Sequence, residues 1–154
     1  MKILVLGLGN PILSDDSVGW KVAEAIRQRV DCPNVTVQET SLAGLSLLDL
    51  LVGYDRAILV DAIRTKDGQP GNIYVLAPED FKGSPRASSP HDVSFREALE
   101  LGRKLCLDLP KEIVIVAVEV EDTTTFGESC TPSVQAAIPG AVELVLERLL
   151  SSSG

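Results

Sequence analysis

The sequence is poor in the residues that build multi-histidine metal centres, disulfide frameworks and base-stacking surfaces. It has one histidine among 154 residues, which excludes H-E-x-x-H zinc proteases and three-histidine zinc centres made from this chain alone. Its three cysteines, Cys32, Cys106 and Cys130, form no C-x-x-C pair and predict no disulfide framework. Aromatic residues make up only 4% of the chain, which is too few for a nucleic-acid stacking platform.

Basic residues are fewer than acidic ones, 14 against 22, so the formal net charge is −8. A chain this acidic is poorly suited to bind phosphate backbones or anionic membrane surfaces. No apolar run approaches the length of a membrane span, and the amino terminus lacks the pattern of a signal peptide. We therefore expect a cytoplasmic, monomeric protein with no nucleic-acid partner and no membrane partner.

The length and the apolar content favour one compact unit. Apolar residues make up 45% of the 154 residues, which suits one domain with a sizeable core. Neither internal repeats nor a linker-like composition interrupt it. The sequence predicts a single domain over residues 1–150 and a disordered tail over residues 151–154, which read Ser-Ser-Ser-Gly.

Three continuous apolar runs, Ile3–Leu8, Ala57–Val60 and Ile113–Val118, indicate strands that are covered on both faces. Residues 34–39 alternate between apolar and polar, as a less buried edge strand does. Residues 72–76 form a short strand after a turn-forming segment. Five strands are therefore predicted.

Helices are predicted between and after these strands. Valine and isoleucine recur every four residues from 18 to 30, which gives one apolar helical stripe. Residues 94–97 fit a capping box that opens a helix, and Ala98, Leu101 and Leu105 are expected to face the core. A last helix is expected from Pro132 to about residue 150, kinked or divided by Pro139.

Strands that alternate with helices predict an α/β sandwich around a mainly parallel sheet. Only about a dozen residues connect the strand that ends near Val60 to the one that starts near Ile73, which is short for a helical crossover. The fourth strand is therefore predicted to run antiparallel to its neighbours.

Three side chains stand where ligands bind in such folds. Asp16 follows the first strand, Asp61 ends the third, and His91 lies in the long loop after the fourth. Ligands of open α/β sheets bind beyond the carboxyl ends of strands, where successive crossovers diverge. Two carboxylates and one imidazole could ligate Ni or Zn and leave coordination positions open.

Each of these residues also has a purely structural interpretation. Asp16 could cap a helix, Asp61 could anchor a loop, and His91 could be a solvated loop residue. Asp16 and Asp61 could also form an aspartic dyad, which would leave His91 without a role.

Several other chemistries are poorly supported. The segment Gly7-Leu8-Gly9-Asn10-Pro11 lacks the third glycine of a dinucleotide-binding loop, and the chain has no G-x-S-x-G elbow. Cys130 precedes the last predicted helix, where a thiolate could be stabilised. Nothing in the sequence pairs Cys130 with His91.

Four segments together resemble the hydrogenase maturation endopeptidases. They are Gly7–Gly19, Leu59–Ala62, Ser89–Asp92 and Cys130–Val134, and they follow the family's order over nearly the whole chain. The resemblance implies a three-layer α/β/α sandwich of the phosphorylase/hydrolase-like type. It also implies a five-stranded, mostly parallel twisted sheet with one antiparallel strand.

The resemblance further implies a metal-dependent endopeptidase, of aspartyl or metallo type. Such an enzyme removes the carboxy-terminal extension of a [NiFe] hydrogenase large-subunit precursor after nickel insertion. The family's catalytic and metal-binding roles fall here on Asp16, Asp61 and His91. The precursor supplies the nickel, and Zn or Cd could replace it in a crystal.

The match to the family has two departures. The family's acidic ligand is often Glu, whereas Asp16 is one methylene shorter, which leaves Asp15 as a substitute. Where the family often has Gly-Thr-x-Gly, this chain has Ser41-Leu42-Ala43-Gly44, and only Gly44 carries over. The resemblance implies that substrate is positioned by Gly9, Asn10, Asp15 and Gly44.

Two rival interpretations come from other functional classes. The Gly-Leu-Gly-Asn-Pro opening is similar to that of peptidyl-tRNA hydrolase, but the catalytic histidine of that family is missing after it and the acidic charge suits tRNA badly. The other rival is a non-catalytic, metal-sensing chaperone that holds the precursor without cutting it.

Overall fold

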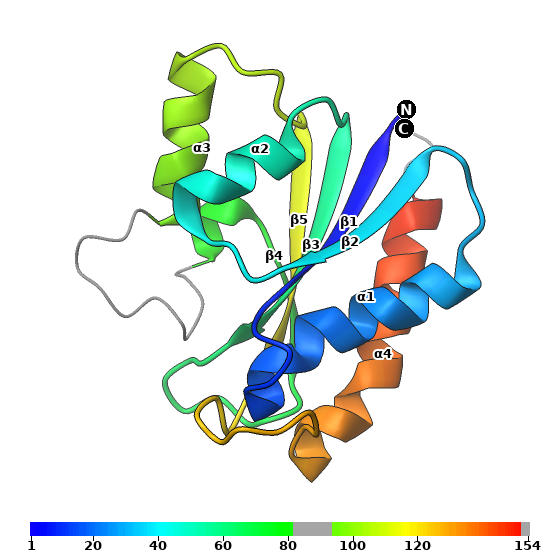
Figure 1. Cartoon of the computed structure of the whole chain (residues 1–154), viewed down its shortest axis with the longest axis vertical. Helices are drawn as coiled ribbons and strands as arrows, with labels where there is room; N and C mark the ends of the chain where they lie inside the picture. The colour runs from blue at the N-terminus through cyan, green and yellow to red at the C-terminus, as the bar shows by residue number, and fades with distance from the viewer. Residues whose placement is uncertain (82–93, 152–154) are drawn as a thin grey trace.

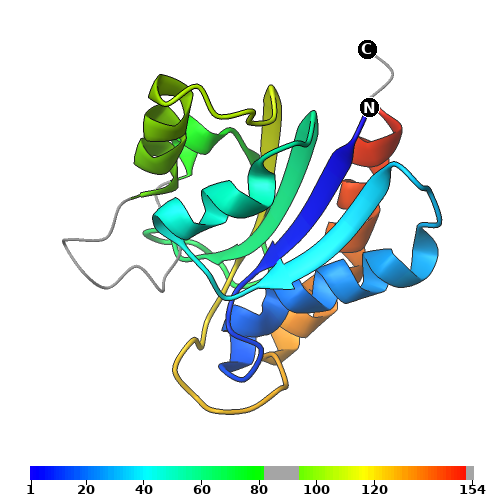
Figure 2. The same ribbon diagram turned by 45° about the horizontal axis from the view of Figure 1, so that its top comes forward.

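The computed structural model describes residues 1–81 and 94–151, in which five strands form one twisted sheet (Figures 1 and 2). The strands are β1 (Ile3–Leu8), β2 (Val35–Thr40), β3 (Arg56–Ile63), β4 (Ile73–Leu76) and β5 (Glu112–Glu119). Their order in the sheet is β2-β1-β3-β5-β4. All neighbouring pairs are parallel except β4 and β5, which are antiparallel. The predicted fold class is confirmed, including its antiparallel fourth strand.

Helices cover both faces of the sheet and make three layers (Figure 1). The helices are α1 (Val18–Arg29), α2 (Leu48–Leu51), α3 (Phe95–Lys104) and α4 (Pro132–Leu150). One face is covered by α1 and α4, and the other by α2 and α3. Three short 3₁₀ helices lie in the connections: η1 (Ser14–Ser17), η2 (Gly44–Leu47) and η3 (Pro78–Asp80).

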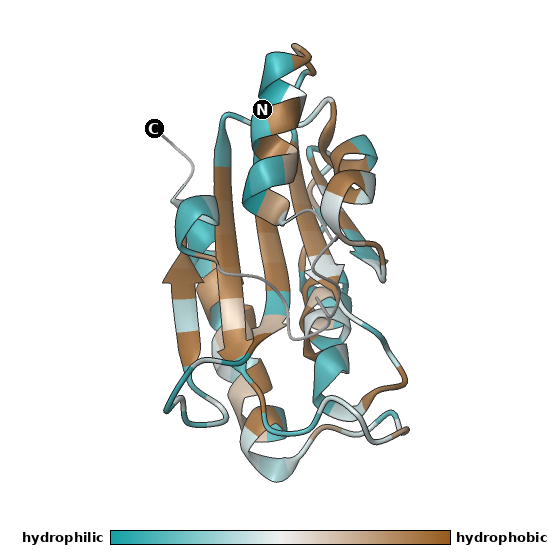
Figure 3. Cartoon of the chain, turned by 90° about the vertical axis from the view of Figure 1, so that its left-hand side faces the viewer, coloured by the Kyte–Doolittle hydropathy of each residue, from teal (hydrophilic) through white to brown (hydrophobic). Residues whose placement is uncertain are grey.

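The continuous apolar runs are explained by burial on both faces of the sheet. In β1, Leu4 and Leu6 belong to the core cluster beneath α2 and α3, whereas Val5 belongs to the cluster beneath α1 and α4. Successive side chains of a strand point to opposite faces, so a strand covered twice needs apolar residues throughout. Figure 3 shows this as long hydrophobic stretches along the central strands.

The edge strand β2 is also as predicted. All its residues are half-buried, since only one side of it pairs with a neighbour, β1. Polar and apolar residues alternate along it because one face meets the core and the other meets solvent.

In α3 the capping box forms, and the predicted inward face is confirmed at Ala98 but wrong at Leu101 and Leu105. Ser94 caps the helix, and its Oγ accepts the backbone N–H of Glu97 at 3.2 Å. Leu101, expected in the core, is 41% exposed. The residues of α3 that are buried lie three and four positions apart along the helix: Phe95, Ala98, Leu99 and Gly102. Two of them, Ala98 and Gly102, are small and allow the helix to pack closely against the core.

The last helix, α4, continues through Pro139 without being divided. Pro139 cannot donate to the carbonyl of Gln135, four residues earlier. Both residues are exposed, so water can satisfy that carbonyl. Ser151 ends α4 as its C-cap, and the rest of the predicted tail, 152–154, lies outside the described residues. Over the part of the chain that is described, no helix is both long and apolar enough to cross a membrane.

Candidate functional site

The candidate site lies at the carboxyl edge of the sheet, between β1 and β3. The connection from β1 to β2 carries α1 on one face, and the connection from β2 to β3 carries α2 on the other. Chain crossovers therefore diverge at the neighbouring strands β1 and β3, which is where open α/β sheets bind ligands.

Asp16 lies in η1, the 3₁₀ turn between β1 and α1, and is fully buried. Its Oδ2 accepts the backbone N–H of Asn10 at 3.0 Å. Its own N–H donates to the carbonyl of Leu13 at 2.9 Å, and η1 packs against β3. The loop that leaves β1 is thus folded around this carboxylate. The N-cap residue of α1 is Ser17 rather than Asp16.

Asp61 lies inside β3 rather than at its end, because the strand continues to Ile63. It is fully buried, and its Oδ1 accepts the N–H of Ala62 at 2.8 Å. Asp61 alternates with Leu59 and Ile63, which belong to the core cluster beneath α2 and α3. The carboxylate therefore lies on the α2 and α3 face of the sheet.

The third predicted residue, His91, lies outside the described residues. The nearest buried residues that the structure describes before and after it, Phe81 and Phe95, belong to the cluster beneath α2 and α3. This is the face to which Asp61 points. Within the described ranges no group of three or more His, Cys, Asp or Glu side chains is arranged to hold a metal ion. The three-residue ligand set stays a prediction.

Asp15, expected to help position substrate, is bound to the protein's own loops. It is fully buried, and its Oδ2 accepts the N–H groups of Glu121 and Asp122, both at 3.0 Å. Its Oδ1 accepts the N–H of Thr131 at 2.6 Å, and the Thr131 hydroxyl donates to both oxygens. These contacts join the loop after β1 to the loop after β5 and to the start of α4. A role for Asp15 in substrate positioning would therefore be indirect.

The glycines of the first loop are required by close backbone approach. Gly9 has φ of +135°, and a Cβ there would lie 2.0 Å from the carbonyl oxygen of Asp16. Asn10 closes a short turn, since its Oδ1 accepts the N–H of Ile12 at 3.1 Å. Gly44, with φ of +58°, opens η2 in the connection that follows β2. Gly9 and Asn10 thus shape the backbone around Asp16, and their contact with substrate stays a prediction.

A fourth buried carboxylate, Glu119, was not predicted from the sequence. It ends β5 and stands opposite Ile63 of β3, so its side chain is on the same face as Asp61. Its carboxylate accepts the N–H and the hydroxyl of Thr65 at 2.8 and 2.6 Å, and the hydroxyl of Tyr74 at 3.1 Å. One feature of the sequence could have identified Glu119, namely an acidic residue directly after a continuous apolar run, as at Asp61.

Cys130 does not have the environment of a nucleophile. Burial raises the pKa of its thiol above the ordinary value. Its Sγ lies 3.6 Å from the hydroxyl of Ser17 and 3.9 Å from the carbonyl of Ser14. The predicted stabilisation of a thiolate is wrong, because the buried neutral thiol is favoured.

The described site is thus chemically a carboxylate site. Asp16 lies in the connection after β1 and Asp61 lies near the end of the neighbouring strand β3, and each has one oxygen oriented by a backbone N–H. Carboxylates can take a proton from water as a general base or ligate a cation through oxygen. Both uses fit hydrolysis.

Comparison with known proteins identifies close relatives of this chain. The family model described as hydrogenase maturation protease matches residues 20–148. The hydrogenase 2 maturation protease of Escherichia coli is 33% identical over 154 residues, which covers 99% of this chain and 93% of that protein. The structure of the E. coli endopeptidase HybD superposes with a TM-score of 0.84 at 33% identity, covering 99% of this chain and 94% of that one. A protease structure from Thermococcus kodakarensis, HycI, has a TM-score of 0.73 at 24% identity, covers 97% and 93% of the two chains, and supports the fold alone.

Proposed function

The chain belongs to the hydrogenase maturation protease family, and we propose that it removes the carboxy-terminal extension of a [NiFe] hydrogenase large-subunit precursor after nickel insertion. The observation that carries this proposal is the pair of fully buried carboxylates, Asp16 and Asp61, at the carboxyl edge of β1 and β3. They stand in the motifs that resemble the family's acidic ligands.

Nickel enters this proposal as part of the substrate. Asp16, Asp61 and His91 would contact nickel that the precursor already holds, so that only a loaded precursor is seated correctly. The burial of both carboxylates supports this, because carboxylates shielded from water interact more strongly with a cation. The backbone donors at Asn10 and Ala62 would hold the two carboxylates in fixed orientations.

Peptide hydrolysis then requires a base near the scissile carbonyl. Either aspartate could take the proton from the attacking water once the substrate is seated. Gly9, Asn10 and Gly44 would border the seated peptide, and Asp15 would keep the surrounding loops in place. We further propose that the enzyme acts as a monomer in the cytoplasm.

The test is a cleavage assay with purified precursor in nickel-loaded and nickel-free forms. The proposal predicts loss of the extension's mass from the loaded form only. Cleavage of both forms would contradict the nickel requirement. Binding of the loaded form without any change in mass would instead support the non-catalytic chaperone.

A further inference from the structure

A groove of about 600 Å³ runs along the outer side of α1, separate from the two buried aspartates. It lies between β2 on one side and α4 on the other, and its lining includes Pro11, Trp20, Lys21, Arg27, Gln135 and Ile138. Its volume is within the range of ligand-binding clefts, which is about 300–1,000 Å³. We call it the α1 groove.

The α1 groove begins beside the Asp16 loop. Pro11 follows Asn10, whose N–H donates to Asp16. A Cβ on Gly9 would lie 2.0 Å from the Asp16 carbonyl oxygen and 3.8 Å from Cδ1 of Trp20. These distances place the indole ring and the main chain of Asp16 beside the same residue, Gly9, so a chain that leaves the aspartates over this loop would enter the groove.

The walls of the groove are held in place by hydrogen bonds. The indole N–H of Trp20 donates to the carbonyl of Gly9 at 2.8 Å and lies 3.3 Å from that of Thr40. Trp20 therefore bridges the ends of β1 and β2. A preordered wall lowers the entropic cost of binding a peptide.

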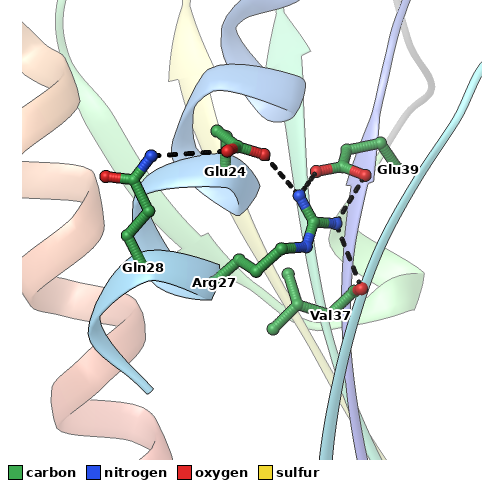
Figure 4. Close-up of polar contacts among 5 residues, drawn as sticks. All are labelled: Glu24, Arg27, Gln28, Val37 and Glu39. Carbon is green, nitrogen blue, oxygen red and sulfur yellow. Dashed lines mark hydrogen bonds and ion pairs between the residues drawn. The ribbon is translucent and has the colours of Figure 1, made fainter. Parts of the chain in front are cut away.

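Arg27 forms a second fixed point (Figure 4). Its guanidinium donates to Glu39 at 2.7 Å, to the Val37 carbonyl at 3.2 Å, and to Glu24. The hydrogen bond to Glu39 is the main cause that raises the pKa of Arg27 above its ordinary value. Two carboxylates thus balance the positive charge of Arg27. Its guanidinium also donates a hydrogen bond to a main-chain carbonyl on the outer edge of β2.

Lys21 differs from Arg27 because no carboxylate of the described residues lies within ion-pair distance of its ammonium, although Glu24, Glu39 and Glu128 also line the groove. Its ammonium donates to the backbone carbonyl of Glu128. An ammonium has three donors, so it can bind a further acceptor oxygen. The groove therefore combines the Lys21 ammonium with the apolar surfaces of Pro11, Trp20 and Ile138, and its remaining charged lining is Arg27 with Glu24, Glu39 and Glu128.

We propose that the α1 groove binds the carboxy-terminal extension of the precursor, the segment that cleavage releases. An apolar side chain of the extension packs against Trp20, and one of its backbone or terminal carboxylate oxygens accepts from Lys21. This inference rests on the proposed function. When the scissile bond lies near Asp16 and Asp61, the residues on its amino-terminal side hold the nickel and continue into the folded body of the precursor. The residues on its carboxy-terminal side are the extension, and they are the ones that can lie along the protease surface.

Trp20 is the only tryptophan of the chain, so its fluorescence reports on the groove. The probe is a synthetic, tryptophan-free peptide with the sequence of the extension. Titration of the wild-type protein should give a saturable blue shift as the indole loses water. Lys21→Glu should weaken peptide binding about tenfold and raise the KM for the precursor similarly, with kcat retained. Lys21→Arg should restore binding.

The matched control is Lys104→Glu, which makes the same charge change on an exposed residue at the end of α3, on the opposite face of the sheet. It should leave binding and KM within about twofold, since exposed surface substitutions have small effects. Circular dichroism melting checks that each variant folds. If folded Lys21→Glu binds the peptide as the wild type does, the groove assignment is wrong.

The outcomes separate this inference from the proposed function. Cleavage of the precursor without a fluorescence shift overturns the groove assignment alone. A Lys21-dependent shift without cleavage supports the groove and overturns the protease. Neither cleavage nor a shift overturns both.

Discussion

The carboxylate of Asp15 accepts the backbone N–H of Thr131 at 2.6 Å and its hydroxyl at 2.8 Å, across 116 residues of chain. Thr131 is the residue that precedes α4, and Asp15 is the direct neighbour of Asp16. One buried carboxylate therefore ties the start of the last helix to the loop that carries the candidate catalytic aspartate. The position of Asp16 depends on a contact that forms only when both ends of the chain have folded.

Replacing Asp15 should therefore destabilise the whole domain. Asp15→Ala leaves three backbone N–H groups near Asp15 without their acceptor, those of Glu121, Asp122 and Thr131. The expected loss in the free energy of unfolding is about 3 kcal/mol, measured by urea denaturation. Asp31→Ala, at an exposed position, should change it by less than about 0.5 kcal/mol. Equal stability of the two variants would contradict this role of Asp15.

Gly9→Ala should disturb the site through a backbone clash. The new Cβ would meet the Asp16 carbonyl oxygen at 2.0 Å in a backbone with φ of +135°. Gly53→Ala separates strain from clash, because Gly53 has φ of +93° but no atom within 4 Å of its Cβ position. Gly53→Ala should cost about 1–2 kcal/mol of stability, and Gly9→Ala at least about 2 kcal/mol more. Thermal and urea unfolding measure the stability of both variants. Similar losses of stability in the two would contradict the predicted clash and show that the loop moves to accommodate the new Cβ.

The three cysteines should differ in reactivity. Cys32 and Cys106 are exposed, whereas burial raises the pKa of the Cys130 thiol, so less thiolate is present at Cys130 at any given pH. At neutral pH a thiol reagent such as DTNB should modify Cys32 and Cys106 quickly and Cys130 slowly. Raising the pH should increase the rate at Cys130 the most before global unfolding occurs. Rapid modification of Cys130 at neutral pH, located by peptide mapping, would contradict its described burial.

The parts of the fold that the sequence predicted are those set by local patterns. β1 could be recognised because burial of every residue from Ile3 to Leu8 requires a continuous apolar run. β2 could be recognised because apolar and polar residues alternate along an edge strand. The capping box at Ser94 depends on residues three apart. The inward face of α3 was wrong at Leu101, because the approach of a small-residue face to the sheet depends on tertiary packing.

The site was predictable to a similar extent. Asp61 and Asp16 could be selected because they follow buried runs at the same edge of a parallel sheet. The partners of Asp15 and Glu119 could not be predicted, since they lie far along the chain and are brought together by the folded loops. Trp20 was overlooked for the same reason, because its two carbonyl partners end different strands.

The most direct test of the central claim is mass spectrometry of nickel-loaded precursor incubated with wild-type enzyme and with Asp61→Asn, Asp16→Asn and His91→Ala. Asp67→Asn makes the same chemical change at an exposed loop position and serves as the control. The account predicts that the wild type and Asp67→Asn release the extension. The three site variants should slow cleavage by at least about 10²-fold while retaining their folded spectra. Release of the extension at the wild-type rate by folded Asp61→Asn would contradict the account.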